Sequence, residues 1–380
     1  MKKIVIAPDS FKESMTAKQA AEAVKRGFES IYKGSVVYDL IPMADGGEGT
    51  IQSLAVGLNG SLHEKVVTGP LGEPVKAKYA ISGDQSTAII EMAEASGLAL
   101  VPYEKRNPLK TTTYGTGELI KAALDHGVSK IILGIGGSAT NDGGAGMIMA
   151  LGGVLYAKDG NSIARGGEAL QELVKMDLTN MDPRLKQVRI EVACDVDNPL
   201  LGPRGASAVY GPQKGATPEM VEQLDKALAN YHDVMKRATG KDVKTTPGAG
   251  AAGGIGVSLL ACLDAKLVPG IDIVLKHTNF AERVADADIV ITGEGKIDSQ
   301  TTYGKAPIGV AKLAKKYSDA TVIAICGTLG DGHEIVFEHG IDAAFSIVRG
   351  PCQIEDAIKN ALENLEATAR NIARVMKIGI

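Results

Sequence analysis

The feature that most constrains the fold of this chain is the run at residues 131–147, Ile-Ile-Leu-Gly-Ile-Gly-Gly-Ser-Ala-Thr-Asn-Asp-Gly-Gly-Ala-Gly-Met. A short apolar strand leads directly into a small polar loop, and a helical segment follows. Such a loop directs several backbone N–H groups at one point beside a helix N-terminus, where anions and especially phosphates bind. The same glycines are also what a tight turn with positive φ requires. The density of small polar residues favours binding, and the predicted substrate- and phosphate-binding residues of this loop are Gly136, Gly137, Ser138, Thr140, Asn141 and Asp142.

Four other apolar runs of the chain end in the same abrupt way. Residues 4–7, 36–41, 188–192 and 289–292 are each followed at once by polar or glycine residues. Ligands of open α/β sheets bind at the carboxyl ends of the strands, so these loops are predicted to form one shared polar site. The candidates that they supply are Asp9, Ser10, Lys12, Asp45, Asp195, Asp197, Glu294 and Asp298.

The acidic candidates also have plainer interpretations. Asp9 is placed to cap the helix expected from residue 17 or to hold a turn, and Asp142 is placed to cap the helix that follows it. Asp195 suits an Asx-turn ahead of a proline. Its position directly after an apolar strand is nevertheless where a catalytic carboxylate gains a rigid support.

Three lysines stand out by position. Lys12 follows the first strand, although a solvated surface is the usual place of a lysine. Lys214 and Lys305 lie in tight loops, Gly-Pro-Gln-Lys-Gly and Tyr-Gly-Lys-Ala-Pro, which is unusual for lysines that are merely solvated. All three are predicted to contact an anionic group.

The order of the expected elements indicates an α/β protein of two domains. Strands and helices alternate over residues 1–60 and again over 281–380, which predicts one Rossmann-like, flavodoxin-like domain with a parallel sheet. Residues 63–68, 75–81 and 88–92 are alternating runs separated by turn residues, as is typical of antiparallel strands. Residues 61–280 are therefore expected to form a second, inserted α/β domain with antiparallel strands, and residues 113–135 fit either domain.

The parallel sheet is expected to join strands from both ends of the chain. Its five predicted strands are residues 3–7, 36–41, 289–292, 321–326 and 343–348. An apolar stripe at helical spacing predicts one long helix over residues 354–376. The stripe consists of Ala357, Ala361, Leu362, Leu365, Ala369 and Ile372.

Composition narrows the function classes. A net charge of −4 and an aromatic content of 4% do not favour nucleic acid or an anionic membrane surface. No apolar stretch approaches the ~20 residues of a membrane span, and the first apolar run is too short for a signal peptide. The 4 cysteines have no CxxC spacing, so buried free thiols in a reducing cytoplasm are expected.

Two glycine motifs test the dinucleotide-binding alternative. The GxGxxG match at residues 248–253 does not follow a strand, so it fails the context that this fingerprint needs. The GxGxxA match at 134–139 does follow a strand, but no acidic residue ends a second strand about 20 residues later. No P-loop and no protein-kinase signature is present. An NAD(P)-binding oxidoreductase or a sugar-phosphate-binding protein is therefore the alternative, and phosphate chemistry with another loop design is favoured.

Taken together, these loops resemble those of the type I glycerate kinase family. The resemblance covers nearly the whole chain. Its motifs are Pro-Asp-Ser-Phe-Lys at 8–12, Pro-Met-Ala-Asp-Gly-Gly-Glu-Gly-Thr at 42–50, Gly-Thr-Gly-Glu-Leu-Ile at 115–120, Gly-Ile-Gly-Gly-Ser-Ala-Thr-Asn-Asp-Gly-Gly at 134–144, Ala-Cys-Asp-Val-Asp-Asn-Pro-Leu at 193–200, Gly-Pro-Gln-Lys-Gly-Ala at 211–216, Pro-Gly-Ala-Gly-Ala-Ala-Gly-Gly at 247–254 and Ile-Thr-Gly-Glu-Gly-Lys-Ile-Asp at 291–298. One departure is Glu13, which stands where the family commonly has glycine.

The resemblance implies ATP-dependent phosphorylation of D-glycerate with Mg²⁺, and 2-phosphoglycerate is favoured over 3-phosphoglycerate as the product. Phosphoryl transfer needs a phosphate cradle, carboxylates for a metal, a cation and a base. Asp195, Lys12 and Asp45 are the predicted catalytic residues. Asp197, Glu294 and Asp298 are the predicted Mg²⁺ ligands. The expected partners are small molecules only, and the expected state is a cytoplasmic monomer or homodimer.

Overall fold

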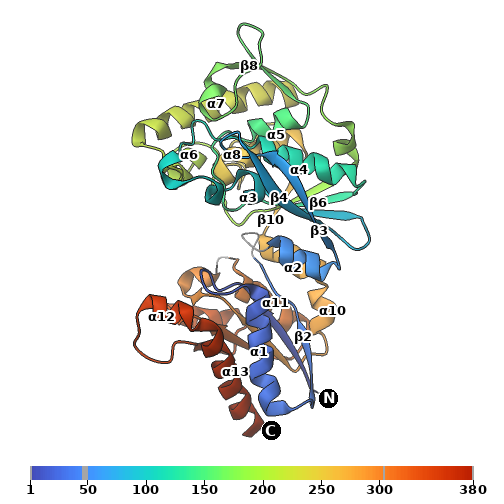
Figure 1. Ribbon diagram of the computed structural model, residues 1–380, viewed down its shortest axis with the longest axis vertical. Helices are drawn as coiled ribbons and strands as arrows, with labels where there is room; N and C mark the ends of the chain where they lie inside the picture. The colour runs from blue at the N-terminus through green and yellow to red at the C-terminus, as the bar shows by residue number, and fades with distance from the viewer. Residues whose placement is uncertain (1, 45–49, 303, 379–380) are drawn as a thin grey trace. The chain divides into compact units, whose positions relative to one another are not determined.

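The computed structural model describes residues 2–44, 50–302 and 304–378 (Figure 1). The chain divides into two compact units. Unit 1 comprises Met1–Asp45, Gln52–Leu58 and Pro269–Ile380, and unit 2 comprises Gly46–Ile51 and Asn59–Val268. Among the described residues, no helix combines the length and the apolarity that crossing a membrane requires.

Unit 1 contains a five-stranded sheet in the order β15-β13-β11-β1-β2, and every neighbouring pair is parallel. The sheet that was predicted to join both ends of the chain is therefore confirmed. Its strands are nearly continuous apolar runs because helices cover both of its faces. The strand bounds are β1 Lys2–Pro8, β2 Val36–Leu40, β11 Ile289–Gly293, β13 Thr321–Cys326 and β15 Ala343–Ser346.

The helices of unit 1 follow the predicted alternation. Helix α1 begins after a capping box in which Thr16 and Gln19 bond to each other's backbone N–H groups, so Asp9 is not its cap. The bounds are α1 Ala17–Tyr32, α2 Thr50–Gly57, α9 Gly270–His277, α10 Phe280–Val284, α11 Ala306–Tyr317, α12 Ile354–Lys359 and α13 Ala361–Ile378, with short 3₁₀ turns at Ser299–Thr302 and His333–His339 and a small parallel pair β12 Lys296–Ile297 and β14 Thr328–Leu329.

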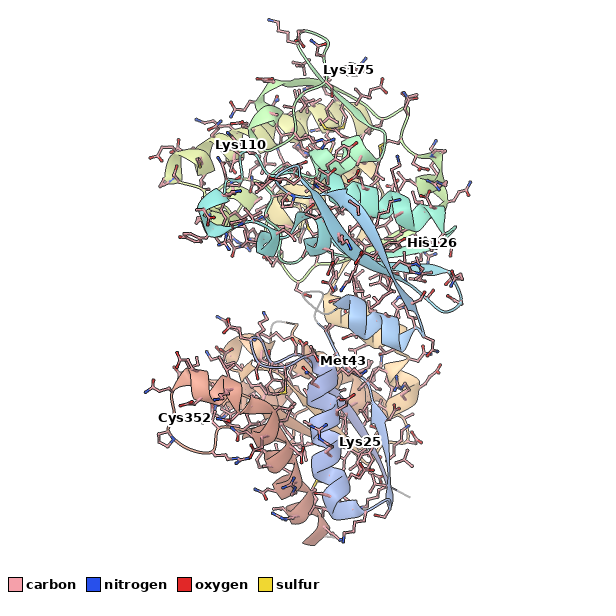
Figure 2. The ribbon with its side chains drawn as sticks, viewed as in Figure 1. Lys25, Met43, Lys110, His126, Lys175 and Cys352 are labelled. Carbon is pink, nitrogen blue, oxygen red and sulfur yellow. The ribbon has the colours of Figure 1, made fainter. Side chains whose placement is uncertain are left out.

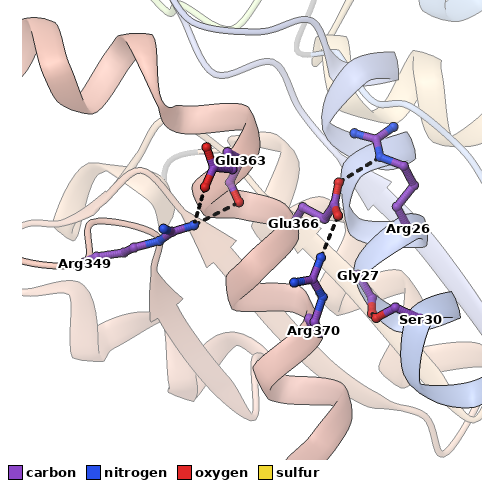
Figure 3. Close-up of polar contacts among 7 residues, drawn as sticks. All are labelled: Arg26, Gly27, Ser30, Arg349, Glu363, Glu366 and Arg370. Carbon is purple, nitrogen blue, oxygen red and sulfur yellow. Dashed lines mark hydrogen bonds and ion pairs between the residues drawn. The ribbon is translucent and has the colours of Figure 1, made fainter.

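Helices α1 and α13 pack closely against each other on one face of this sheet. Gly27 makes the close approach possible, because a Cβ there would lie 2.6 Å from Glu366 O. At the edge of the contact, Glu366 accepts hydrogen bonds from Arg26 at 2.9 Å and from Arg370 at 2.7 Å (Figure 3). The first and last helices of the chain therefore fold as one layer.

The prediction of one helix over residues 354–376 is wrong. Two helices, α12 and α13, are separated at Asn360, whose φ is −97° and ψ is 5°. The Asn360 side-chain amide donates to Asp356 O at 2.9 Å, a local bond that competes with regular helix. Leu365 of the predicted stripe is buried, but Leu362 is 39% exposed.

A strained residue follows the first strand. Glu13 has φ +63°, in the left-handed region that side chains with a Cβ adopt at a cost. This is the position where the resembling family commonly has glycine. The departure from the family pattern is therefore a departure from the residue that this backbone favours.

Unit 2 contains a six-stranded sheet in the order β10-β9-β6-β5-β4-β3. Strands β3, β4 and β5 are antiparallel, as predicted, and β5, β6, β9 and β10 are parallel. The strand bounds are β3 Ser61–Thr68, β4 Pro74–Ile81, β5 Thr87–Glu91, β6 Lys130–Gly134, β9 Arg189–Ala193 and β10 Lys266–Val268, with a separate antiparallel pair β7 Val154–Ala157 and β8 Leu173–Asp177.

Helices of unit 2 and its sheet enclose one large apolar core. The segment 113–135, which holds α4 and β6, belongs to this unit. The helix bounds are α3 Ala93–Ser96, α4 Tyr114–Asp125, α5 Ala145–Ala150, α6 Ala206–Tyr210, α7 Pro218–Thr239 and α8 Ala251–Cys262, and 3₁₀ turns lie at Leu98–Leu100, Tyr103–Lys105, Glu168–Glu172, Pro183–Gln187 and Pro212–Lys214.

The cysteines are free thiols, as the sequence predicted. Cys326 is buried, as expected, whereas Cys352 is exposed (Figure 2), so the expectation of a buried thiol is wrong for Cys352.

Candidate functional site

The glycine loop of unit 2 follows β6 at the centre of the parallel half of its sheet. Gly134, the last residue of β6, is paired in register with Glu91 of β5 and with Ala193 of β9. The loop ends at Gly144, which has φ +84° and precedes the short helix α5. The carboxyl ends of three strands therefore meet at the start of this loop, as predicted for a ligand site.

Asp142 holds this loop from inside. Its carboxylate is fully buried and accepts hydrogen bonds from Thr113 N at 2.8 Å, Thr113 Oγ1 at 2.9 Å, Gly144 N at 3.1 Å and Gly146 N at 3.2 Å. Burial raises the pKa of the Asp142 carboxyl, and these hydrogen bonds oppose the rise. Asp142 thus ties the start of α4 to the start of α5, which is closer to the capping interpretation than to a direct substrate contact.

Lys214 is a buried lysine at the same loop. Its side chain is 1% exposed, and Nζ donates to Ser138 Oγ at 2.7 Å and to Thr140 O at 2.6 Å. Burial lowers the pKa of Lys214 to about 7, and the charge of Asp142 opposes the fall. The predicted anion contact of Lys214 is therefore accompanied by an internal role that the sequence did not indicate.

A second glycine segment packs on the first. Ala252, Gly253 and Gly254 are consecutive residues in the left-handed region, with φ of 51°, 77° and 86°. A Cβ on Gly253 would lie 1.9 Å from Thr140 O, and Gly143 N donates to Gly253 O at 3.1 Å. The glycine-rich segment 248–253, which does not fit the dinucleotide fingerprint, thus packs directly against the glycine loop after β6.

Several polar groups of the loop have no protein partner. Among the described residues, no acceptor binds the backbone N–H groups of Thr140, Asn141 and Asp142. Thr140 Oγ1 and Asn141 Oδ1 are also buried without a partner. Buried polar groups in proteins are normally hydrogen-bonded, so these groups are suited to a bound ligand.

The acidic pair after β9 is more open. Asp195 is exposed, and Asp197 forms an ion pair with Arg204 at 2.9 Å. Asn198 anchors the segment, because its amide donates to Arg204 O at 2.8 Å and its Oδ1 accepts from Tyr210 OH at 2.6 Å. The backbone that carries Asp195 is therefore held between the strand end and a fixed turn.

In unit 1 the predicted residues lie at the carboxyl ends of β1 and β11. Asp9 is buried, its N–H donates to Gly293 O at 2.8 Å, and its Oδ1 accepts from Ser10 N at 2.6 Å. A Cβ on Gly295 would lie 3.6 Å from the Lys12 backbone N, so the loops after the two strands are neighbours. The Lys12 side chain is exposed.

Both acids after β11 are paired with lysines. Glu294 accepts from Thr301 Oγ1 at 2.9 Å and from Lys305 Nζ at 3.2 Å. Asp298 forms an ion pair with Lys296 at 2.9 Å, and this hydrogen-bonded lysine holds the pKa of Asp298 below its usual value. Lys305 is thus directed at a carboxylate within the predicted loop cluster.

The structure distributes the predicted residues over the two units. Asp45 lies outside the described residues. Sequence reasoning missed Glu91, a buried carboxylate at the end of β5 that accepts from Ile51 N at 2.7 Å, and Ser207, which accepts from Asn141 Nδ2 at 3.0 Å. Glu91 ends an apolar run, as the other strand-end acids do, so the rule that acids at strand ends are candidate site residues could have identified it. Ser207 and Thr113 lie in helices or at their starts and carried no such signal.

The sheet with its glycine loop and buried lysine defines an α/β protein with a candidate anion site at its strand ends. The sequence matches the model of the Glycerate kinase family over residues 4–377. It is 58% identical to a glycerate kinase of Halalkalibacterium halodurans, covering 99% of this chain and 98% of that protein. It is 52% identical to the glycerate 2-kinase of Escherichia coli, covering 100% of this chain and 99% of that protein.

Structural comparison agrees. The crystal structure of a candidate glycerate kinase 2 from Salmonella typhimurium LT2 is similar with a TM-score of 0.90 at 53% identity, covering 100% of this chain and 99% of that one. The chain belongs to the glycerate kinase family. This membership decides between phosphoryl transfer and the dehydrogenase alternative in favour of phosphoryl transfer.

Proposed function

We propose that this protein transfers the γ-phosphoryl group of ATP to D-glycerate with Mg²⁺ and forms 2-phosphoglycerate. The family membership supports the reaction, and the E. coli relative named glycerate 2-kinase supports the product. The observation that carries the proposal is the loop after β6, whose unpartnered N–H groups lie beside a buried lysine.

The loop of unit 2 is proposed to bind the phosphates of ATP. Helix α5 has 6 residues, so its dipole is weak and the individual N–H groups carry the interaction. Three consecutive N–H groups from Thr140 to Asp142 match the nests that bind phosphate oxygens. Gly136, Gly137 and Ser138 are proposed to complete this cradle.

The proposed base is Asp195. It stands on an anchored turn after β9, where its exposed carboxylate is able to accept the proton of the glycerate hydroxyl. The alkoxide oxygen then attacks the γ-phosphorus, and the bond to the ADP oxygen breaks. Asp197 is bound to Arg204 and is less available for this step. Asp45 remains a predicted catalytic residue outside the described part of the chain.

The acidic residues fit a Mg²⁺ ion that ATP itself helps to hold. Among the described residues, no three His, Cys, Asp or Glu side chains converge as a metal site. Mg²⁺ commonly uses only one or two carboxylates together with substrate phosphates, so a proposed site needs few protein ligands. Glu294 and Asp298 of unit 1 and, separately, Asp197 of unit 2 are the proposed candidate ligands, and a bound ion would neutralise charge on the transferred phosphoryl group.

The loops of unit 1 are proposed to bind the remaining negative charge of the substrates. The exposed ammonium of Lys12 is available to a carboxylate or phosphate. Asp9, Ser10 and Lys305 lie at the same strand ends and are proposed to orient that group. Charge-assisted hydrogen bonds of this kind are the strong ones in binding sites.

A coupled kinase assay with ³¹P NMR of the product tests the proposal. With ATP, Mg²⁺ and D-glycerate, ADP should accumulate and the phosphorus signal should be that of 2-phosphoglycerate. ATP with Mg²⁺ should raise the melting temperature and NAD should not, because only a ligand of the folded state stabilises it. No ATP consumption with any metal refutes the function, and a 3-phosphoglycerate signal refutes the product.

The bacterial relatives and the use of ATP support a cytoplasmic location. A monomer or homodimer is proposed, and light scattering during chromatography measures which of the two forms.

A further inference from the structure

The ammonium of Lys214 is the most unusual charged group among the described residues. Lysines are almost never fully buried without a partner, yet this one is 1% exposed. Its acceptors are a hydroxyl and a carbonyl, Ser138 Oγ at 2.7 Å and Thr140 O at 2.6 Å. Both belong to the glycine loop, so Lys214 is directed at the loop's own atoms.

The bond to Thr140 O fixes a direction. The peptide that joins Thr140 to Asn141 is trans, and in a trans peptide the carbonyl and the following N–H point in opposite directions. Holding Thr140 O toward Nζ therefore turns the Asn141 N–H away from Lys214. That N–H has no acceptor among the described residues, so the lysine presents it to a ligand.

Glycine backbone packs against the same oxygen. Gly253 lies so close that a Cβ would be 1.9 Å from Thr140 O. The carbonyl of Thr140 is thus both bonded to the ammonium and packed against Gly253. Interiors are packed densely enough that such a peptide has few alternatives while the ammonium stays in place.

We propose that Lys214 is a positioning residue, which holds the Ser138–Thr140 segment so that the Asn141 N–H faces the phosphates of ATP. This inference rests on the proposed function and adds a role for a side chain that acts through the loop. Asp142 is the acid whose charge acts on the ammonium, and Ser138 and Thr140 are its uncharged acceptors. Both hydrogen bonds are stronger when Lys214 is charged, so we expect full activity to require that form.

The charge requirement predicts a pH dependence of kcat/KM for ATP. Because burial lowers the pKa of Lys214 to about 7, the free enzyme should lose kcat/KM as the pH rises through that value. Bound ATP adds negative charge nearby and raises this pKa, so the fall in kcat should lie at higher pH. The two profiles report the free and the bound enzyme separately.

Two substitutions test the role, and a third provides the control. Lys214→Met should lower kcat/KM for ATP about 10²-fold, the scale of a lost charge-assisted contact in a dry site. Its melting temperature should fall moderately, because two buried acceptors lose their donor, so the kinetics are measured at a temperature where circular dichroism shows the variant folded. Lys214→Arg should recover part of the activity and abolish the fall near neutral pH, because guanidinium stays charged. Lys226→Met removes an exposed lysine of α7 and should leave kcat/KM within about twofold.

A further variant separates positioning from packing. Lys214→Ala leaves space beside Ser138, so ethylammonium should restore activity to it and should not do so in Lys226→Met. Loss of kcat/KM by less than about threefold in Lys214→Met would overturn the proposal, because a phosphate-cradle contact is worth more. Persistence of the wild-type pH fall in Lys214→Arg would also overturn it.

A failure of the proposed function can be distinguished from a failure of the Lys214 proposal. If the wild type does not phosphorylate D-glycerate, the function fails, and ATP affinity by calorimetry still tests Lys214. Lys214→Met should then weaken ATP binding at least about tenfold, while unchanged affinity would overturn the positioning role.

Discussion

The strand ends of the two units both carry acids and lysines, but they hold them in different ways. In unit 2, Asp142 and Lys214 are at most 1% exposed, and most of their partners are backbone groups. In unit 1, Glu294 and Asp298 bind the side chains of Lys305 and Lys296, which are 34% and 59% exposed. The buried charges Asp142 and Lys214 are part of the loop's interior, whereas the lysines that bind Glu294 and Asp298 are partly exposed.

This difference has an energetic consequence. Exposed ion pairs contribute about 0–1 kcal/mol, because water competes for both charges. A buried charge that loses its partners costs about 3–5 kcal/mol. Substitutions that remove a buried partner in unit 2 are therefore expected to lower stability more than substitutions that remove a partly exposed partner in unit 1.

The largest effect is expected at the end of β9 in unit 2. Asp195→Asn keeps the side-chain shape and any Asx-turn but removes a base, so kcat should fall by about 10²–10⁴. The melting temperature should stay unchanged. Steady-state kinetics at saturating Mg²⁺ measure the effect, and ATP binding should remain detectable.

Asp233→Asn, which changes an exposed acid of α7, is the control for this prediction. Its kcat should stay within about twofold of the wild-type value. An Asp195→Asn enzyme that keeps more than about a tenth of wild-type kcat would assign that residue to the turn. The base would then be sought at Asp298 or Asp45.

The second prediction compares the loss of stability on removing Asp142 with the loss on removing Glu294. Asp142→Ala removes the acceptor of three backbone N–H groups in a buried site, so the free energy of unfolding should fall by about 3 kcal/mol or more. Glu294→Ala removes an acid whose lysine is partly exposed, and it should cost about 1 kcal/mol. Urea denaturation followed by circular dichroism measures both.

Equal losses in these two variants would break the comparison between the units. A loss in Asp142→Ala that Asp142→Asn does not reduce would also contradict it, because asparagine keeps one carbonyl acceptor for the same donors.

The sequence was sufficient to predict the sheets and incomplete for the interior of the site. The strand-end rule located the glycine loop and the acids, because apolar runs and loop composition are local properties. It also predicted β1 and β11 in one sheet, since both runs are buried on two faces. The contacts of Lys214 were not predictable, because Ser138 and Thr140 are more than 70 residues away in the chain.

Two other differences have the same origin. The break at Asn360 is accompanied by a hydrogen bond from its side chain to a carbonyl one turn earlier. The spacing of the apolar residues does not indicate whether that bond forms, so it could not predict the break. The position of Asp142 was predicted with two roles. The hydrogen bond from Thr113, the residue just before α4, shows that the Asp142 carboxylate is buried between two helix starts. That contact joins distant parts of the chain and could not be predicted from sequence.

A third prediction tests the expected affinity role of unit 1. Lys12→Ala removes an exposed ammonium beside β1 and should raise KM or lower kcat by about 10²-fold, the scale of one charge-assisted contact in a site that excludes water. Its melting temperature should barely change. Lys18→Ala, on the exposed side of α1, is the control, and near wild-type kinetics for Lys12→Ala would show a surface lysine.

The smallest effect is expected from backbone strain in the same loop. Glu13 has φ +63°, and glycine adopts that conformation without the steric cost of roughly 1–2 kcal/mol that a Cβ imposes. Glu13→Gly should therefore stabilise the protein by about 0.5–1 kcal/mol, the part of that cost left after the extra entropy of an unfolded glycine. The shift in the urea midpoint of unit 1 measures it.

Lys18→Gly makes this prediction specific to the backbone. The same residue type is introduced a few positions later, inside α1 with helical geometry, where glycine costs about 1 kcal/mol relative to a good helix former. The two variants should thus move stability in opposite directions. If both variants lower the stability, the left-handed conformation of Glu13 carries no steric cost that glycine could relieve. Contacts of the Glu13 side chain would then offset that cost.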